Sequence, residues 1–99
     1  MDLFELPEGS YGIHLSWSAD GKQLAFVQSS RSIKQVFSMD IDTKKIVQLT
    51  KLEKDCNNLS WSPNGKIIVF DTADDHETII YMKNLETKKL SEISKLKRV

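Results

Sequence analysis

The sequence predicts an all-β protein built from two copies of one four-stranded antiparallel unit. The first observation is the phrase LSWSADGK at residues 15–22, which returns as LSWSPNGK at residues 59–66. The second is that a shift of 44 residues, from Leu15 to Leu59, aligns residues 14–55 with 58–99 without a gap. The third is that the apolar stretches are rich in Val, Ile, Phe and Tyr and lack helical spacing.

Each copy contains four short stretches with strand character. In the first copy we expect strands over residues 13–16, 23–28, 34–39 and 45–50. In the second copy we expect them over residues 58–60, 67–72, 78–83 and 89–94. Each stretch is bounded by turn-forming residues, as strands in hairpins are.

The connections support antiparallel pairing. The tetrapeptides SADG and SPNG suit a type I turn followed by a left-handed residue, since Pro63 presets the first central dihedral and Gly21 and Gly65 accept a positive φ. A second tight turn is expected at residues 42–44 and 86–88. Longer polar loops are expected at residues 29–33 and 73–77.

Two strands are apolar on both faces, LAFV at residues 24–27 and IIVF at 67–70. A half-exposed strand alternates with polar residues, whereas a continuous apolar run indicates cover on both sides. Four-stranded sheets sandwiched between similar sheets are the blades of a β-propeller, and a period in the low forties is usual for such blades. The sequence therefore predicts two propeller blades.

The same stretches carry a family resemblance. LSWSPNGKIIVF and LSWSADGKQLAFV resemble the Trp-Ser-Pro-Asp-Gly-Lys motif of TolB-like (WD40-like) β-propeller repeats, over residues 15–50 and 59–94. The resemblance implies a propeller of six to eight blades, used for binding or for gating access to another domain. The family usually has Gly after Thr in the second turn, where this chain has Lys44 and Lys88.

The predicted organisation is incomplete for a propeller. We expect an orphan strand and linker of a preceding blade in residues 1–12, with the strand at 3–6, then blades at 13–55 and 56–99. Two blades cannot close a ring, so an open stack leaves one apolar face uncovered at each end. Either three or four copies assemble into a six- or eight-bladed ring, or the chain is a piece of a longer propeller with the missing blades elsewhere.

Composition narrows the partners. Fourteen Lys and Arg balance fourteen Asp and Glu, so no large positive field attracts phosphates, and we expect no nucleic-acid binding. No apolar run is long enough for membrane insertion. The N-terminus MDLFELPEGS lacks the features of a secretory signal, which makes the cytoplasm the default, although TolB relatives are periplasmic.

Few residues in this sequence are candidates for a catalytic or metal site, and we expect no catalytic residue and no cofactor. Asp74, Asp75 and His76 are weak candidates for a metal site, and a solvated hairpin loop is favoured over it. The other histidine, His14, is expected at a surface or channel, and no Gly-x-Ser-x-Gly motif is present. Cys56, the only cysteine, lies in the polar stretch KDCNN and is expected to be incidental.

The aromatic residues are expected to pack between adjacent blades and not to stack on a ligand, because they recur at matching positions. They are Trp17 and Trp61, Phe26 and Phe70, and Phe37 and Tyr81.

The favoured function is a noncatalytic scaffold that binds a protein or peptide through its inter-strand loops or the central face of the ring. The alternative is an accessory propeller of a prolyl-oligopeptidase-type serine peptidase whose catalytic domain is absent from this chain. A third possibility is a decayed or trimmed repeat pair with no selected function.

Overall fold

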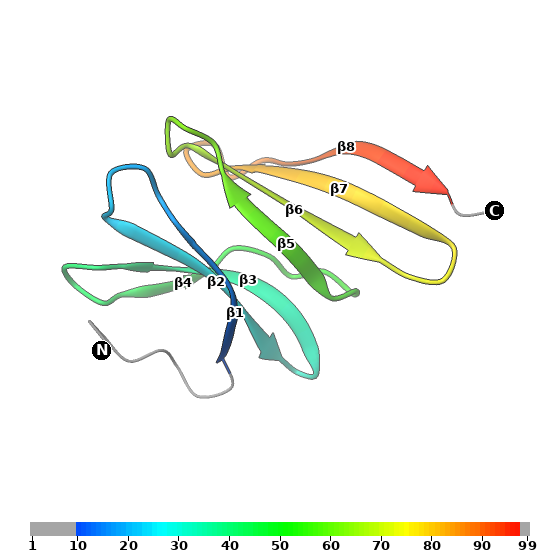
Figure 1. Cartoon of the computed structure of the whole chain (residues 1–99), viewed down its shortest axis with the longest axis horizontal. Helices are drawn as coiled ribbons and strands as arrows, with labels where there is room; N and C mark the ends of the chain where they lie inside the picture. The colour runs from blue at the N-terminus through cyan, green and yellow to red at the C-terminus, as the bar shows by residue number, and fades with distance from the viewer. Residues whose placement is uncertain (1–9, 98–99) are drawn as a thin grey trace.

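The computed structural model describes residues 10–97, with side chains from residue 15 onward. It contains eight strands in two four-stranded antiparallel sheets, and within each sheet every strand pairs with its neighbours in the sequence. The first sheet is formed by β1 (Ser10–Trp17), β2 (Gln23–Ser30), β3 (Ile33–Asp40) and β4 (Ile46–Gln48). The second is formed by β5 (Cys56–Trp61), β6 (Ile67–Ala73), β7 (Glu77–Asn84) and β8 (Leu90–Lys97). Figure 1 shows the second sheet stacked over the first.

All eight predicted strands within residues 10–97 are present, with differences at their ends. Strand β1 begins at Ser10, so His14 lies inside the strand and does not precede it. Strand β4 ends at Gln48, earlier than predicted, because the side-chain hydroxyl of Thr50 accepts a hydrogen bond from the Val36 backbone N–H (3.0 Å) in place of a backbone carbonyl. The strand predicted at residues 3–6 lies outside the described residues.

The two motif turns have the predicted geometry. The Gly21 N–H donates to the Ser18 carbonyl and the Gly65 N–H to the Ser62 carbonyl, both at 3.0 Å. The two glycines have φ of 72° and 73°, in the left-handed region that glycine adopts without a Cβ clash. The repeated phrase therefore encodes a repeated turn and its flanking strands.

The hairpin between β2 and β3 corrects one prediction. The polar residues 29–33 do not form a long loop, because β2 continues to Ser30 and β3 begins at Ile33. The connection consists of Arg31 and Ser32 alone, with φ of 53° and 70°. Two left-handed residues match the right-handed twist of the paired strands, so this polar stretch supports a tight hairpin.

The principal core lies between the two sheets. Ala25 and Val36 of the first sheet form one buried cluster with Cys56, Ile68 and Phe70 of the second. Leu24, Phe26 and Met39, on the other face of the first sheet, form a second buried cluster. Stacked aromatic pairs recur within the sheets, Phe26 with Phe37 (centroids 5.8 Å apart) and Phe70 with Tyr81 (5.5 Å).

A buried polar network fixes the linker at residues 49–55, which joins the two sheets. The Gln35 side-chain amide donates to the Leu52 carbonyl (2.7 Å), and its oxygen accepts from the Leu52 N–H (3.1 Å) and from the Thr50 hydroxyl (2.5 Å). Because Gln35 and Thr50 are buried, these bonds satisfy groups that would otherwise be costly to bury. The linker is thereby fixed against β3.

Candidate binding groove

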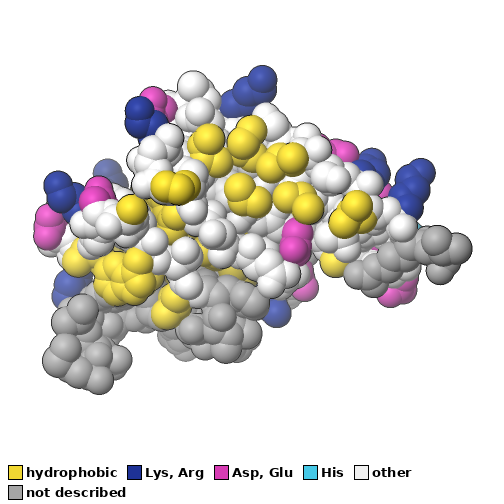
Figure 2. Space-filling view, turned by 45° about the horizontal axis from the view of Figure 1, so that its top comes forward, with side chains coloured by type: hydrophobic (Ala, Val, Ile, Leu, Met, Phe, Trp, Pro, Cys, Tyr) yellow, Lys and Arg dark blue, Asp and Glu magenta, His cyan; other side chains and the backbone are white. Residues whose placement is uncertain are grey.

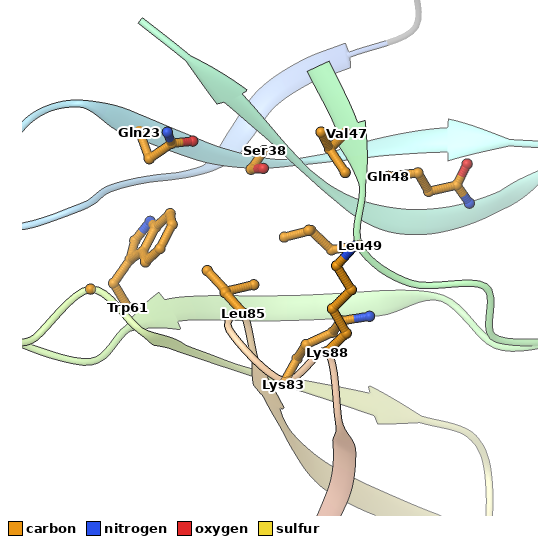
Figure 3. Close-up of a pocket in the computed structure, with 10 residues that line it drawn as sticks. Gln23, Ser38, Val47, Gln48, Leu49, Trp61, Lys83, Leu85 and Lys88 are labelled. Carbon is orange, nitrogen blue, oxygen red and sulfur yellow. The ribbon is translucent and has the colours of Figure 1, made fainter. Parts of the chain in front are cut away.

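A groove of about 480 Å³ lies between the two sheets. Figure 3 shows residues of the first sheet along one side of the groove. Trp61, Leu85, Lys83 and Lys88 of the second sheet lie along the other side. Its lining residues are Gln23, Ser38, Val47, Gln48, Leu49, Trp61, Gly65, Lys83, Leu85 and Lys88. The groove therefore draws on β2, β3, β4, β5 and β7 and on the turns of the second sheet.

The position of Trp61 is fixed by a hydrogen bond between the sheets. Its indole N–H donates to the Ser16 carbonyl of β1 at 2.8 Å. Its ring packs against the core cluster between the sheets, as do Leu49 and Leu85. Leu85 is held in turn by a bond from its N–H to the Lys66 carbonyl (2.8 Å). The apolar floor of the groove is therefore anchored to the folded core.

The charged groups that line the groove are both cationic. Lys83 is half-buried on β7, and Lys88 is exposed in the turn after it. Among the described residues that line the groove, none carries a carboxylate. Gln23 and Gln48 add amide groups, of which the Gln23 nitrogen donates to the Asp40 carboxylate (3.2 Å) and the Gln48 nitrogen to the Thr50 carbonyl (2.7 Å). The groove thus combines an apolar floor with a cationic edge.

The loop that suggested a metal site is organised around an ion pair. Asp74 accepts from the Lys54 ammonium (2.5 Å) and from the backbone N–H groups of His76 (2.8 Å) and Glu77 (2.9 Å). These three hydrogen bonds, of which the one from Lys54 has the largest effect, hold the pKa of the Asp74 carboxyl well below its usual range. Asp75 and His76 are exposed. Among residues 10–97, no three Asp, Glu, His or Cys side chains form a group that could hold a metal ion.

Cys56 is at the first position of β5, in the core, and not in a polar loop as predicted. Burial raises the pKa of its thiol to about 11. The Thr50 hydroxyl lies 3.7 Å from the sulfur and the Gln35 oxygen 3.9 Å from it. A protonated thiol inside the core is a poor nucleophile, so this residue contributes packing.

The two tryptophans occupy equivalent positions with different surroundings. Trp61 packs between the sheets, in line with the prediction for this residue. Trp17 is 47% exposed and lies on the face of the first sheet that is turned away from the second sheet.

The groove itself was not predicted from the sequence. One difference between the two copies does indicate the groove: Lys83 stands at the position that the buried Met39 occupies in the first copy. A charged residue within an otherwise apolar repeat position indicates an opening in the packing.

Comparison with known proteins shows which solved structures these sheets resemble. No protein-family model and no curated protein sequence matches the chain. Among solved structures, a putative TolB from Agrobacterium tumefaciens is similar over 90% of this chain, with a TM-score of 0.74 and 27% identity. TolB from Acinetobacter baumannii is similar over 83%, with a TM-score of 0.74 and 22% identity.

The chain is TolB-like. Its two sheets are blades of a β-propeller, and the chain spans 31% and 21% of the two TolB structures. An acylaminoacyl peptidase from Pyrococcus horikoshii is similar over 95% of this chain and 19% of its own, with a TM-score of 0.74 and 14% identity, which shows a shared fold. None of the residues that the structure describes forms a helix long and apolar enough to span a membrane.

Proposed function

We propose that this TolB-like chain is a noncatalytic scaffold that binds a peptide segment of a partner protein in the groove between its blades. The observation that carries the proposal is the composition of the groove, with Trp61, Leu49 and Leu85 as its floor and Lys83 and Lys88 as the charged residues among its described lining residues. A concave apolar surface with a few polar groups at its edge is typical of a ligand site.

The charge of the groove defines the chemistry of the segment. Two ammonium groups attract a carboxylate and repel a basic residue, so electrostatic complementarity favours an acidic segment. The apolar floor favours a segment that also carries a Leu, Ile or Phe side chain. We therefore expect a short acidic–hydrophobic peptide as the ligand.

The repeat supplies a matched pair of variants to test this site. Lys88 and Lys44 are equivalent residues with φ of 64° and 61°, and Lys88 lines the groove whereas Lys44 does not. Lys88→Glu and Lys44→Glu therefore change the net charge and the local backbone in the same way. The probes are fluorescein-labelled peptides of alternating Asp and Leu and of alternating Lys and Leu, with binding measured by fluorescence anisotropy.

The acidic peptide is expected to bind more tightly than the basic one. Lys88→Glu is expected to weaken that binding by roughly two- to fivefold, the upper part of the range for an exposed charge pair, and Lys44→Glu to leave it unchanged. Equal binding of the two peptides, or equal effects of the two substitutions, would contradict the proposal.

The similarity to acylaminoacyl peptidases supports a second candidate, the accessory propeller of a serine peptidase. In that case the scaffold would control access to a hydrolase domain encoded beside it. Sequencing the coding region around this chain tests the candidate directly. A hydrolase domain with a Gly-x-Ser-x-Gly motif in the same or the adjacent reading frame would support it, and flanking regions without one would contradict it.

A further inference from the structure

The outer face of the second sheet is apolar and open. Val69, Ile80 and Met82 are only partly buried, and Ile93 and Leu96 are 53% and 57% exposed. Figure 2 shows hydrophobic side chains gathered over this sheet. Exposed apolar clusters of this kind usually mark an interface.

The first sheet shows what covers this face. The residues of the first repeat that are equivalent to Val69, Ile80, Ile93 and Leu96 are Ala25, Val36, Leu49 and Leu52. Ala25 and Val36 are 0% exposed, and Leu49 and Leu52 pack against the same cluster. The same repeat positions are thus covered in the first sheet and open in the second.

The cover over the first sheet comes chiefly from β5. This strand contacts β1, β2 and β3, and its Leu59 and Trp61 pack against the core between the sheets. A strand with the sequence and geometry of β5 is therefore the element that fits an outer face of this kind.

Among the strands that the structure describes, β1 has the same sequence pattern as β5. Leu15 and Trp17 stand at the positions of Leu59 and Trp61, and they are 43% and 47% exposed. Leu24 and Phe26 on the same face are already buried in the single chain, so among residues 15–97 the large exposed apolar side chains on this side are Leu15, Trp17 and Ile46, which is 39% exposed.

At the repeat positions that line the groove, the proposed contact between copies has apolar residues where the contact inside the chain has polar ones. Inside the chain, Ser38 and Lys83 line the groove between the sheets. The residues at these repeat positions on the outer faces are Met82, which is partly buried, and Met39, which is 1% exposed in the single chain. Asp71 is a polar residue on the outer face of the second sheet, at the position of the buried Val27, and its carboxylate accepts a hydrogen bond from the Asn58 side chain (3.0 Å).

We propose that a second copy of this chain packs its β1 against the outer face of the second sheet, over β5, β6 and β7 and beside Ile93 and Leu96 of β8, repeating head to tail the interface between the two sheets. Such a contact joins two different surfaces, so it continues from copy to copy until a ring closes. With two blades in each copy, three or four copies close a ring of six or eight blades. This interface lies outside the groove and is independent of the proposed peptide binding.

The test is the solution mass of the full chain, by light scattering on a size-exclusion column, for variants on each surface. Leu15→Lys alters β1 and Leu96→Lys alters the opposite face. Val47→Lys, at a residue that is 48% exposed but lies on neither surface, is the matched control. Because all three residues are exposed, circular dichroism spectra like that of the natural chain are expected.

The natural chain and Val47→Lys are expected to have three or four times the mass of the 11.3 kDa chain. Leu15→Lys and Leu96→Lys are each expected to be monomers. Mixed together, these two variants retain one intact pair of surfaces and are expected to form a dimer. A monomeric natural chain would overturn the proposal, and so would an assembly that Leu96→Lys dissolves and Leu15→Lys does not, since that pattern indicates symmetric pairing of the outer face with itself.

Discussion

Lys44 and Lys88 have a backbone conformation that ordinarily belongs to glycine. Their φ values are 61° and 64°, and the Lys44 N–H donates to the Asp40 carbonyl (2.7 Å) to close the turn. A residue with a Cβ costs about 1–2 kcal/mol in this region. Glycine removes that cost but gives the unfolded chain about 0.4–1 kcal/mol of additional entropy. Lys44→Gly and Lys88→Gly are therefore each expected to stabilise the fold by roughly 0.5–1 kcal/mol.

The assay is thermal unfolding followed by circular dichroism at one fixed protein concentration. At about 4–8 °C per kcal/mol for a chain of this size, each substitution is expected to raise Tm by roughly 2–8 °C. The two turns belong to different sheets, so the double variant should show the sum of both shifts. Lys45→Gly and Lys89→Gly, at neighbouring exposed residues that do not have a positive φ, are expected to lower Tm. A lower Tm for Lys44→Gly and Lys88→Gly as well would refute the reasoning.

Three further predictions concern the packing and charges of the fold. Trp61→Phe removes the donor to the Ser16 carbonyl and is expected to destabilise the chain by about 1 kcal/mol in urea unfolding; an unchanged midpoint would show that the bond between the sheets contributes nothing. The Cys56 thiol, buried and with its pKa raised to about 11, should react with a disulfide reagent at pH 8 roughly a hundredfold more slowly in the folded chain than in urea, and equal rates would contradict its burial. The pKa of Asp74 is lowered by Lys54, so this carboxylate stabilises the folded state above the ordinary Asp pKa, and that stabilisation declines as the pH falls below about 4. Asp74→Asn should accordingly lower Tm at pH 7 and progressively less at pH 3, whereas a Tm difference that does not change with pH would argue against this ion pair.

The strands could be predicted because each position in the repeat occurs twice, so the two residues at that position can be compared. A single strand such as LAFV could belong to several folds, but its repetition as IIVF after equivalent turns identifies a repeated sheet. The positive φ of Gly21 and Gly65 followed from the same comparison. Repeated local sequence patterns were therefore sufficient to predict the strands and the β-propeller fold.

Two expectations were wrong because the pairing and packing of residues, and not their polar composition, determine the structure there. Residues 29–33 have a loop-like composition, yet Ser29 and Ser30 pair with Lys34 and Ile33 because the two-residue turn between them matches the strand twist. Cys56 follows polar residues in the sequence, but the bonds of Gln35 to the linker bring it into the core.

The groove could not be derived from the sequence for the same reason. Its floor joins Leu49 of the first repeat with Trp61 and Leu85 of the second, and its cationic edge belongs to the second repeat alone. The spatial relation between these residues depends on how one sheet is stacked on the other. Differences between the copies, such as Lys83 for Met39, are the part of this information that the sequence does carry.

The stacking of the two sheets is the claim on which the groove and the head-to-tail contact both depend. The measurement that tests it most directly is a nuclear Overhauser spectrum of the isotopically labelled chain. The indole N–H of Trp61, bonded to the Ser16 carbonyl, is expected to show cross-peaks to backbone protons of β1 around Ser16. Cross-peaks within each sheet, without any between the Trp61 indole and β1, would show that the sheets form but do not stack, and would contradict the account.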